Sequence, residues 1–428
     1  MITGLVRRNG LMTFPDAVMH SWRPPVLVAL LAATSSACTV GPDFTPPKAP
    51  STARYTSPHE APGGDDAAHL AVPAQTTTLG ARVTAEWWTL FRSPEIDALV
   101  KDAIAGSPTL ESASARLGEA RQTVAAASGA RYPQVDFSAS ATRGEINAAS
   151  FGLHPDQTPL PPNYNAYQLG PTVSYALDIF GGTRRQIEQT EAMADVWRYQ
   201  LDAAYQALTG NAVTQAVQVA AARAQLRAIH DILELDRQNL KLVGTERQAG
   251  AVPDTDVVSA QTQLAADETL LPAPEQQLDV ARHALAVLLG RRPGEWSAPE
   301  FDLARLVLPE QLPVSLPSQL VHQRPDILAA EAELHAASAQ IGVATAQLYP
   351  SITLSGSVGA AALDPGHLFT PTSLLWSIAA GLTEPVFDGG TREAQRRARF
   401  LQGLCRRLPA DRTASLRAGR RCPAGAHP

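Results

Sequence analysis

Hydrophobic and polar residues alternate with a period of two along two segments of the chain, which is typical of β-strands. The apolar positions are Tyr167, Leu169, Val173, Tyr175 and Leu177, then Leu374, Trp376, Ile378, Ala380 and Leu382. Small or polar residues lie between them, and residues 134–143 and 351–361 alternate with very small side chains. Strands of about ten residues with this pattern are typical of a transmembrane β-barrel. We therefore expect the apolar residues between Tyr167 and Leu177, together with Trp376 and Ile378, to face lipid. The competing interpretation is a sheet of a soluble protein with one solvent-exposed face.

The longest helical signal covers residues 183–249, which contain no proline and only two glycines. At about 1.5 Å per residue, such a helix is on the order of 100 Å long. Gly250 is suited to end it, and Pro253 with Thr255 can begin a return helix toward residue 290, interrupted near the prolines of residues 271–274. Alanine and leucine at heptad-like spacing predict that the two helices pack as an antiparallel coiled coil.

An internal repeat relates the two halves of the chain. Residues 107–140 align without a gap with residues 324–357, and both segments contain a Tyr-Pro pair at the same place. Further on, the glycine pairs Gly181-Gly182 and Gly389-Gly390 recur at the expected corners between strand and helix, where we expect them to act as hinges. Each copy therefore reads as helix, strand, loop, strand and helix. Four strands cannot close a barrel, so the chain must oligomerise, and three protomers would give twelve strands.

A secretory signal is predicted at the amino terminus. Residues 26–37 are uncharged and apolar, but too short to cross a bilayer, which needs about 20 apolar residues. Small residues precede Cys38 and resemble a lipoprotein box, so we expect Cys38 to carry a lipid, and Thr39 after it is consistent with sorting to an outer membrane. The competing interpretations are cleavage by an ordinary signal peptidase and a buried segment with a chance cysteine.

Composition and charge change this picture at the carboxyl end only. The other two cysteines, Cys405 and Cys422, lie near that end, so no disulfide framework holds the body together. The net charge is −6, but residues 400–428 carry six arginines against one aspartate, a local charge of +5. Such a tail could bind nucleic acid or anionic lipid. We expect a frameshifted reading frame there, and no nucleic-acid partner.

Several motifs resemble the TolC-like outer-membrane efflux channels, in particular the nodulation-type (NodT) lipoprotein branch. They are CTVGPDFTPP, AEWWTLFRSPEIDALV, AGAVPDTDVVSAQTQL, ARHALAVLLG and RPDILAAEAELHAASAQIGVATAQLYPSITLSGS. The resemblance implies a mixed α and β membrane protein: a homotrimer with a twelve-stranded outer-membrane barrel and a periplasmic α-helical tunnel. It also implies a periplasmic adaptor, an inner-membrane RND-type pump, and export of drugs or other small toxic compounds. The hairpin tip at Gly250, Ala251, Val252 and Pro253 would contact the adaptor.

The expected domain organisation follows the repeat, with the second copy cut short. The parts are 1–37, a signal peptide; 38–106, a lipidated extended segment and short helix; 107–323, the first repeat with its helical hairpin at 183–290; 324–399, the truncated second repeat; and 400–428, the basic tail. The family pattern implies a second long hairpin after Gly390, where only 38 residues remain. Without it, we expect gaps in the tunnel wall and no helical periodicity beyond residue 400.

Enzymatic chemistry has no support in the sequence. We find no HExxH, GxSxG, P-loop or paired CxxC motif, so we predict no catalytic residue, metal or cofactor. Three hypotheses compete with an efflux channel: a structural envelope lipoprotein without a pore, a channel for type I protein secretion, and a non-functional truncated product.

Overall fold

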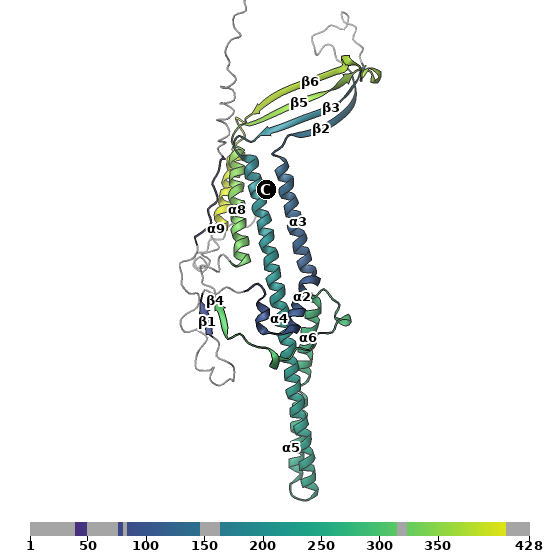
Figure 1. Ribbon diagram of the computed structural model, residues 1–428, viewed down its shortest axis with the longest axis vertical. Helices are drawn as coiled ribbons and strands as arrows, with labels where there is room; N and C mark the ends of the chain where they lie inside the picture. The colour runs from purple at the N-terminus through teal and green to yellow at the C-terminus, as the bar shows by residue number, and fades with distance from the viewer. Residues whose placement is uncertain (1–38, 49–75, 80–83, 146–162, 315–322, 408–428) are drawn as a thin grey trace, which may run out of the picture.

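The computed structural model describes residues 39–48, 76–79, 84–145, 163–314 and 323–407. The molecule is elongated, with a four-stranded sheet at one end, packed helices beneath it and a two-helix hairpin at the other end (Figure 1). Among the described residues, no helix combines the length and the apolar character needed to cross a membrane.

The sheet contains β2 (Gln134–Glu145), β3 (Asn163–Leu177), β5 (Ser351–Ala362) and β6 (Leu374–Thr383) in the order β2-β3-β5-β6. All neighbouring strands are antiparallel. Val173 lies opposite Val135 on one side and Gly356 on the other, and Gly356 lies opposite Ile378. Because directly opposed residues share a face, the register places all the residues predicted to face lipid on one face of the sheet.

The backbones of β3 and β5 approach closely in the middle of the sheet. A Cβ atom at Gly359 would overlap the carbonyl oxygen of Leu169, and one at Gly170 would lie 2.6 Å from the Cα atom of Gly359. Both contacts would be shorter than any normal contact, so glycine is required on both strands here.

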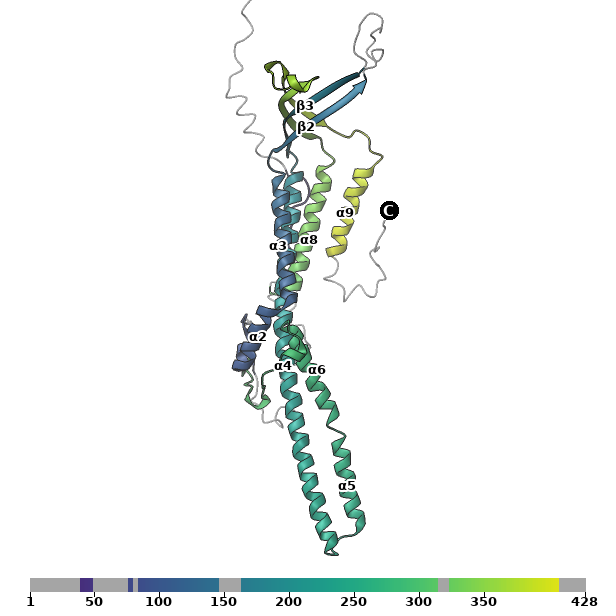
Figure 2. The same ribbon diagram turned by 90° about the vertical axis from the view of Figure 1, so that its right-hand side faces the viewer.

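The helices beneath the sheet are α3 (Pro108–Gly129), α4 (Gly182–Gln248), α8 (Pro325–Ala346) and α9 (Thr391–Arg407). In Figure 2, α9 lies beside α8, on the side away from α3. The helix α4 continues downward into the hairpin, where α5 (Asp254–Glu268) and α6 (Pro272–Leu288) return along it. The predicted long helix, its return and the interruption near the prolines of residues 271–274 are all confirmed.

The main hydrophobic core lies where α4 and α6 meet two short elements, η3 (Trp87–Phe91) and α2 (Pro94–Gly106). Trp88, Ile96, Val100 and Leu285 are at most 1% exposed there. Alanines of α4 complete the contact, since small side chains let helices approach closely. The hydroxyl of Ser93 caps α2 by accepting the backbone N–H of Ile96, at 3.3 Å.

A second, parallel sheet joins β1 (Thr76–Leu79) to β4 (Gln311–Val314). Neither strand was predicted from the sequence, because strands of four residues are too short to display a period. Four short 3₁₀ turns complete the described elements: Pro293–Glu295, Leu303–Arg305, Pro365–His367 and Pro371–Ser373.

The expectation of no helix beyond residue 400 is wrong as far as Arg407, where α9 ends. The first proline after the start of α9 is Pro409, so nothing before it blocks helical hydrogen bonding. Glu393 also pairs with Arg396 and Arg397, three and four residues further on. Such pairs stabilise a helix locally.

We predict that Gly359→Ala destabilises the sheet, because the added methyl group would collide with the Leu169 carbonyl. Overpacking of this kind costs about 1–3 kcal/mol. Gly356→Ala, on the same strand, is the matched control, since its nearest neighbour, the Ser377 oxygen, would be 3.8 Å away. Denaturant unfolding followed by circular dichroism measures both variants. Equal stability of the two would contradict the close approach.

Candidate functional site

One face of the four-stranded sheet is apolar and exposed. The exposed fractions are 70% for Phe137, 70% for Trp376 and 83% for Ile378. By register, the apolar residues of this face are Val135, Phe137, Tyr167, Leu169, Val173, Tyr175, Leu177, Ile352, Leu354, Val358, Leu374, Trp376, Ile378 and Leu382. Arg143, Glu145, Asn163 and Asn165 lie on the same face, at the far end of the β2–β3 pair. Soluble monomers rarely expose a contiguous apolar surface of this extent. The face is therefore suited to an apolar partner or medium.

The opposite face of the sheet is mostly small and polar. Its members include Gln134, Asp136, Ser138, Ser140, Thr142, Gln168, Thr172, Ser174, Thr353, Ser355, Ser357 and Ser377. The hydroxyls of Ser357 and Ser377 are 2.8 Å apart and hydrogen-bond across β5 and β6. This face is suited to water, so the two faces of the sheet suit different environments.

Each strand-to-helix corner combines glycine with an aspartate that caps the following helix. Gly181, Gly389 and Gly390 have φ angles of 77°, 65° and 83°, a region that favours glycine, and Gly182 begins α4. The carboxylate of Asp178 accepts the backbone N–H groups of Thr183 and Arg184, at 2.9 and 3.0 Å. These bonds satisfy donors that a helix start leaves unpaired.

At the second corner, Asp388 caps the start of α9 in the same way. It accepts the backbone N–H groups of Gly390 and Arg392 at 2.9 and 3.1 Å, and hydrogen bonds from these two groups hold its pKa below the ordinary value. The glycines were predicted from the sequence, whereas neither aspartate was. The available signal was an aspartate shortly before each Gly-Gly-Thr-Arg sequence.

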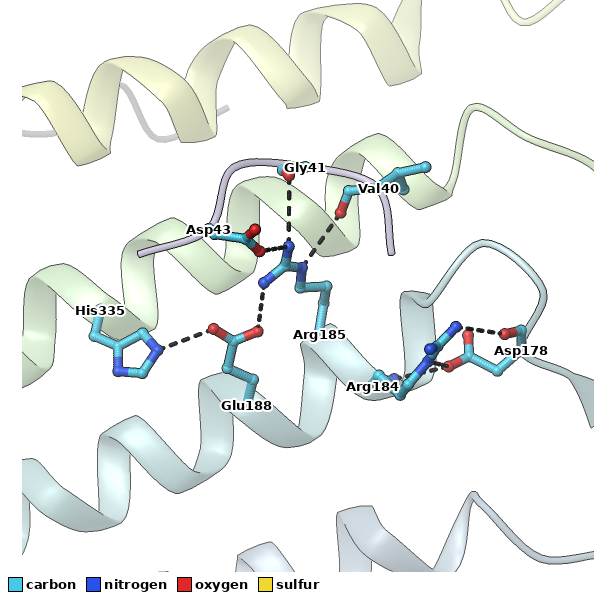
Figure 3. Close-up of polar contacts among 8 residues, drawn as sticks. All are labelled: Val40, Gly41, Asp43, Asp178, Arg184, Arg185, Glu188 and His335. Carbon is cyan, nitrogen blue, oxygen red and sulfur yellow. Dashed lines mark hydrogen bonds and ion pairs between the residues drawn. The ribbon is translucent and has the colours of Figure 1, made fainter. Parts of the chain in front are cut away.

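Residues 39–48, here called the N-terminal strap, lie beside α4 and α8 (Figure 3), and the backbone N–H of Val40 donates to the Phe180 carbonyl just after the end of β3. Arg185 of α4 is 4% exposed and points at the strap. Its Nη2 atom lies 2.6 Å from Asp43 Oδ1, and its guanidinium donates to the carbonyl oxygens of Val40 and Gly41 at 3.3 and 3.4 Å. Its Nη1 atom lies 2.7 Å from Glu188 Oε2. Burial lowers the pKa of Arg185, but its hydrogen bonds to Asp43 and Glu188 raise it overall.

The network continues onto α8. His335 Nε2 lies 2.9 Å from Glu188 Oε1, and the ring of Phe44 stacks on the His335 ring with centroids 4.5 Å apart. The strap is thus attached to two helices that are far apart in the sequence. The residue predicted to carry the lipid, Cys38, precedes the strap and lies outside the described residues.

The hairpin tip ends α4 with a Schellman motif. Gly250 has a φ of 76°, and its N–H donates to the Arg247 carbonyl while that of Ala251 donates to the Glu246 carbonyl, both at 2.9 Å. Gly250 therefore terminates the helix as predicted. Arg247 also pairs with Asp254 across the turn. Gly250, Ala251 and Pro253 are exposed and Val252 is half-buried, so the tip is accessible.

Two carboxyl groups face each other in the hairpin, Asp236 on α4 and Asp267 on α5. Burial raises the pKa of Asp236 above its ordinary value, and the hydrogen bond and negative charge of Asp267 add to this. Ionisation of Asp236 is therefore less favourable in the folded hairpin than in the unfolded chain, first because of burial and then because of Asp267. Within the described ranges, no cluster of three histidine, cysteine, aspartate or glutamate side chains could hold a metal ion.

Comparison with known proteins gives a consistent match. A family model described as outer membrane efflux protein matches residues 99–291 and 316–402. The pyoverdine export outer membrane protein OpmQ of Pseudomonas aeruginosa is 31% identical, over 76% of this chain and 69% of its own length. Nodulation protein T of Rhizobium leguminosarum bv. trifolii is 27% identical, over 83% of this chain and 71% of its own.

Solved structures agree with these sequence relatives. The outer-membrane channel OprN superimposes with a TM-score of 0.75 at 29% identity, covering 89% of this chain and 80% of its own. The CusC structure, described in terms of transmembrane channel formation, gives a TM-score of 0.70 at 22% identity, covering 88% and 79%. The second likeness concerns the fold alone.

We predict that Asp236→Asn stabilises the hairpin at neutral pH. A carboxyl whose pKa is raised by folding destabilises the folded state when ionised, so stability rises as pH falls through the raised pKa toward about 4. The substitution should raise the amide-exchange protection factors of residues 254–268 at pH 7 and flatten their pH dependence. Asp231→Asn, exposed on the same helix, is the control. Unchanged protection in Asp236→Asn would contradict the unfavourable ionisation of Asp236.

Proposed function

Because the chain belongs to the outer membrane efflux protein family, we propose that it forms, as a homotrimer, the outer-membrane channel of a tripartite efflux pump. The members of this family are outer-membrane channel proteins and not enzymes. The observation that carries the trimer is the open, four-stranded sheet with one apolar and one polar face.

The open edges of the sheet support closure with further copies. The edge strands are β2 and β6, and three successive antiparallel pairings make them run in opposite directions. The outer edge of β6 can therefore pair antiparallel with β2 of the next copy. Unpaired edges are not tolerated in a lipid bilayer, because their N–H and C=O groups find no water there. Three copies would close a barrel of twelve strands.

The two faces of the sheet support its orientation in such a barrel. The apolar face, with Tyr167, Leu169, Val173, Trp376 and Ile378, would contact lipid. The polar face would line the lumen, as in other transmembrane barrels. The helical body and the hairpin would then form a periplasmic tunnel built from both repeats.

The two ends of each protomer have separate proposed roles. At the sheet end, a lipid on Cys38 would anchor the strap in the outer membrane. At the far end, the accessible tip around Val252 and Pro253 would meet the periplasmic adaptor of an RND-type pump. Gly181 and Gly389, at the corners, would let each strand turn into its helix.

We propose small organic compounds as the exported cargo. One relative is named for pyoverdine export, another for fusaric acid resistance and a third as part of an antibiotic efflux pump. Liposomes that contain the purified, assembled chain should release a trapped small dye and retain a labelled dextran of protein size. Absence of dye release would refute the channel, and release of both markers would favour protein secretion.

We predict that Val173→Arg reduces the amount of heat-resistant trimer in outer-membrane fractions. A charge at the lipid-facing midplane of a barrel costs about 2–4 kcal/mol. Thr172→Arg, one residue away on the polar face, is the matched control and should assemble nearly as well. Gel electrophoresis without boiling measures the trimer. Equal loss in both variants would argue against the proposed orientation.

We predict that Cys38→Ser abolishes incorporation of a clickable palmitate into the protein, because the thiol is the site of lipidation. Labelling of intact cells followed by purification measures the incorporation. Labelling of the serine variant as strong as that of the parent would exclude Cys38 as the lipid site.

A further inference from the structure

The N-terminal strap is attached at the corner between β3 and α4. The backbone N–H of Val40 donates to the carbonyl oxygen of Phe180 at 3.2 Å. A Cβ atom on the next residue, Gly181, would lie 2.6 Å from Cγ2 of Thr39, so the strap and the corner backbone are in close contact. The start of the strap therefore lies at the level where the sheet joins the helices.

Glycines allow the strap to lie directly on α8. A Cβ atom at Gly41 would lie 2.5 Å from the Cα atom of Gly342, and one at Gly342 would lie 2.8 Å from Cγ of Arg185. The strap, α8 and the Arg185 side chain thus form three layers in direct contact. Any larger side chain at either glycine would separate them.

Arg185 provides most of the polar contact that holds the strap. It bonds two strap carbonyls and the Asp43 carboxylate from a buried position, while the Asp43 side chain itself is 91% exposed. Hydrogen bonds from an ionised guanidinium are stronger than neutral ones. Glu188 holds the other side of the guanidinium and is itself bonded to His335. The residues of α4 and α8 thus present a preformed site for the strap.

We propose that Arg185 is a positioning residue: it docks the strap against the β3–α4 corner and thereby fixes the depth at which the lipid of Cys38 meets the membrane. Consecutive Cα atoms are about 3.8 Å apart, so a lipid on the residue before Thr39 is confined near this corner. The acyl chains then enter the bilayer at the base of the sheet. The lipid part of this inference rests on the proposed lipidation of Cys38, whereas the docking of the strap does not.

Docking is tested by the mobility of a spin label at Thr45→Cys in the full chain, with Cys38, Cys405 and Cys422 replaced by serine so that position 45 carries the only thiol. Its electron paramagnetic resonance spectrum should be that of an immobilised label in the parent. Arg185→Gln and Asp43→Asn should both convert it to a mainly mobile spectrum. Arg198→Gln, a half-exposed arginine on the same helix, is the control and should leave it immobilised. An immobilised label in both test variants would overturn the proposal.

Asp43→Asn keeps the experiment decisive if Arg185→Gln fails to fold. The Asp43 side chain is 91% exposed, so Asp43→Asn removes the carboxylate from Arg185 without changing any side chain of α4. A label that stays immobilised in Asp43→Asn alone, with α4 intact by circular dichroism, would also count against the Asp43–Arg185 contact.

The lipid part is tested by a double-mutant cycle on trimer yield in membranes. If strap docking acts by placing the lipid, Cys38→Ser and Asp43→Asn should each lower the yield, and the double variant should be no worse than the poorer single variant. Independent, multiplying losses would overturn the role in lipid placement. Palmitate labelling of Asp43→Asn should equal that of the parent. Absence of label in the parent itself would refute lipidation while leaving the spin-label result intact.

Discussion

The need to pair the backbone groups of the sheet edges determines how this protein can exist in a membrane. In the part of the chain that the structure describes, strands β2 and β6 each have one unpaired side, and lipid offers no substitute hydrogen-bond partner. The apolar face can enter lipid only if further copies complete the hydrogen bonding. In the proposed channel, membrane insertion and assembly would therefore be coupled, because the closed oligomer could insert and the single chain could not.

The corners transmit the geometry of that sheet to the helices. At each corner a glycine with positive φ turns the chain, and a carboxylate from Asp178 or Asp388 fixes the first turn of the helix that follows. The strap adds a third connection at the first corner, through Arg185. Charged and backbone hydrogen bonds thus hold the junction between the two parts, together with the stacked rings of Phe180 and Tyr349.

Local patterns explain what the sequence predicted well. Alternation within single strands identified the shared face of Val173 and Ile378, and the absence of proline identified the length of α4. Contacts between distant segments left no such pattern: Asp43 and Arg185 are separated by 142 residues, and the strands β1 and β4 are too short to show a period. The corner aspartates were missed because they occupy different positions before the two glycine pairs.

The uninterrupted α4 also fixes the length of the protomer. Its 67 residues run from the corner to the tip without a break, so its length sets the distance between the sheet and whatever binds the tip. Inserting seven residues would keep the same helix face inward but displace the tip by about 10 Å. A single inserted residue would instead turn the tip by about 100°. We therefore expect the distance between the sheet and the tip to change during evolution in steps of whole heptads. Each step in α4 would need an equal change in the return helix.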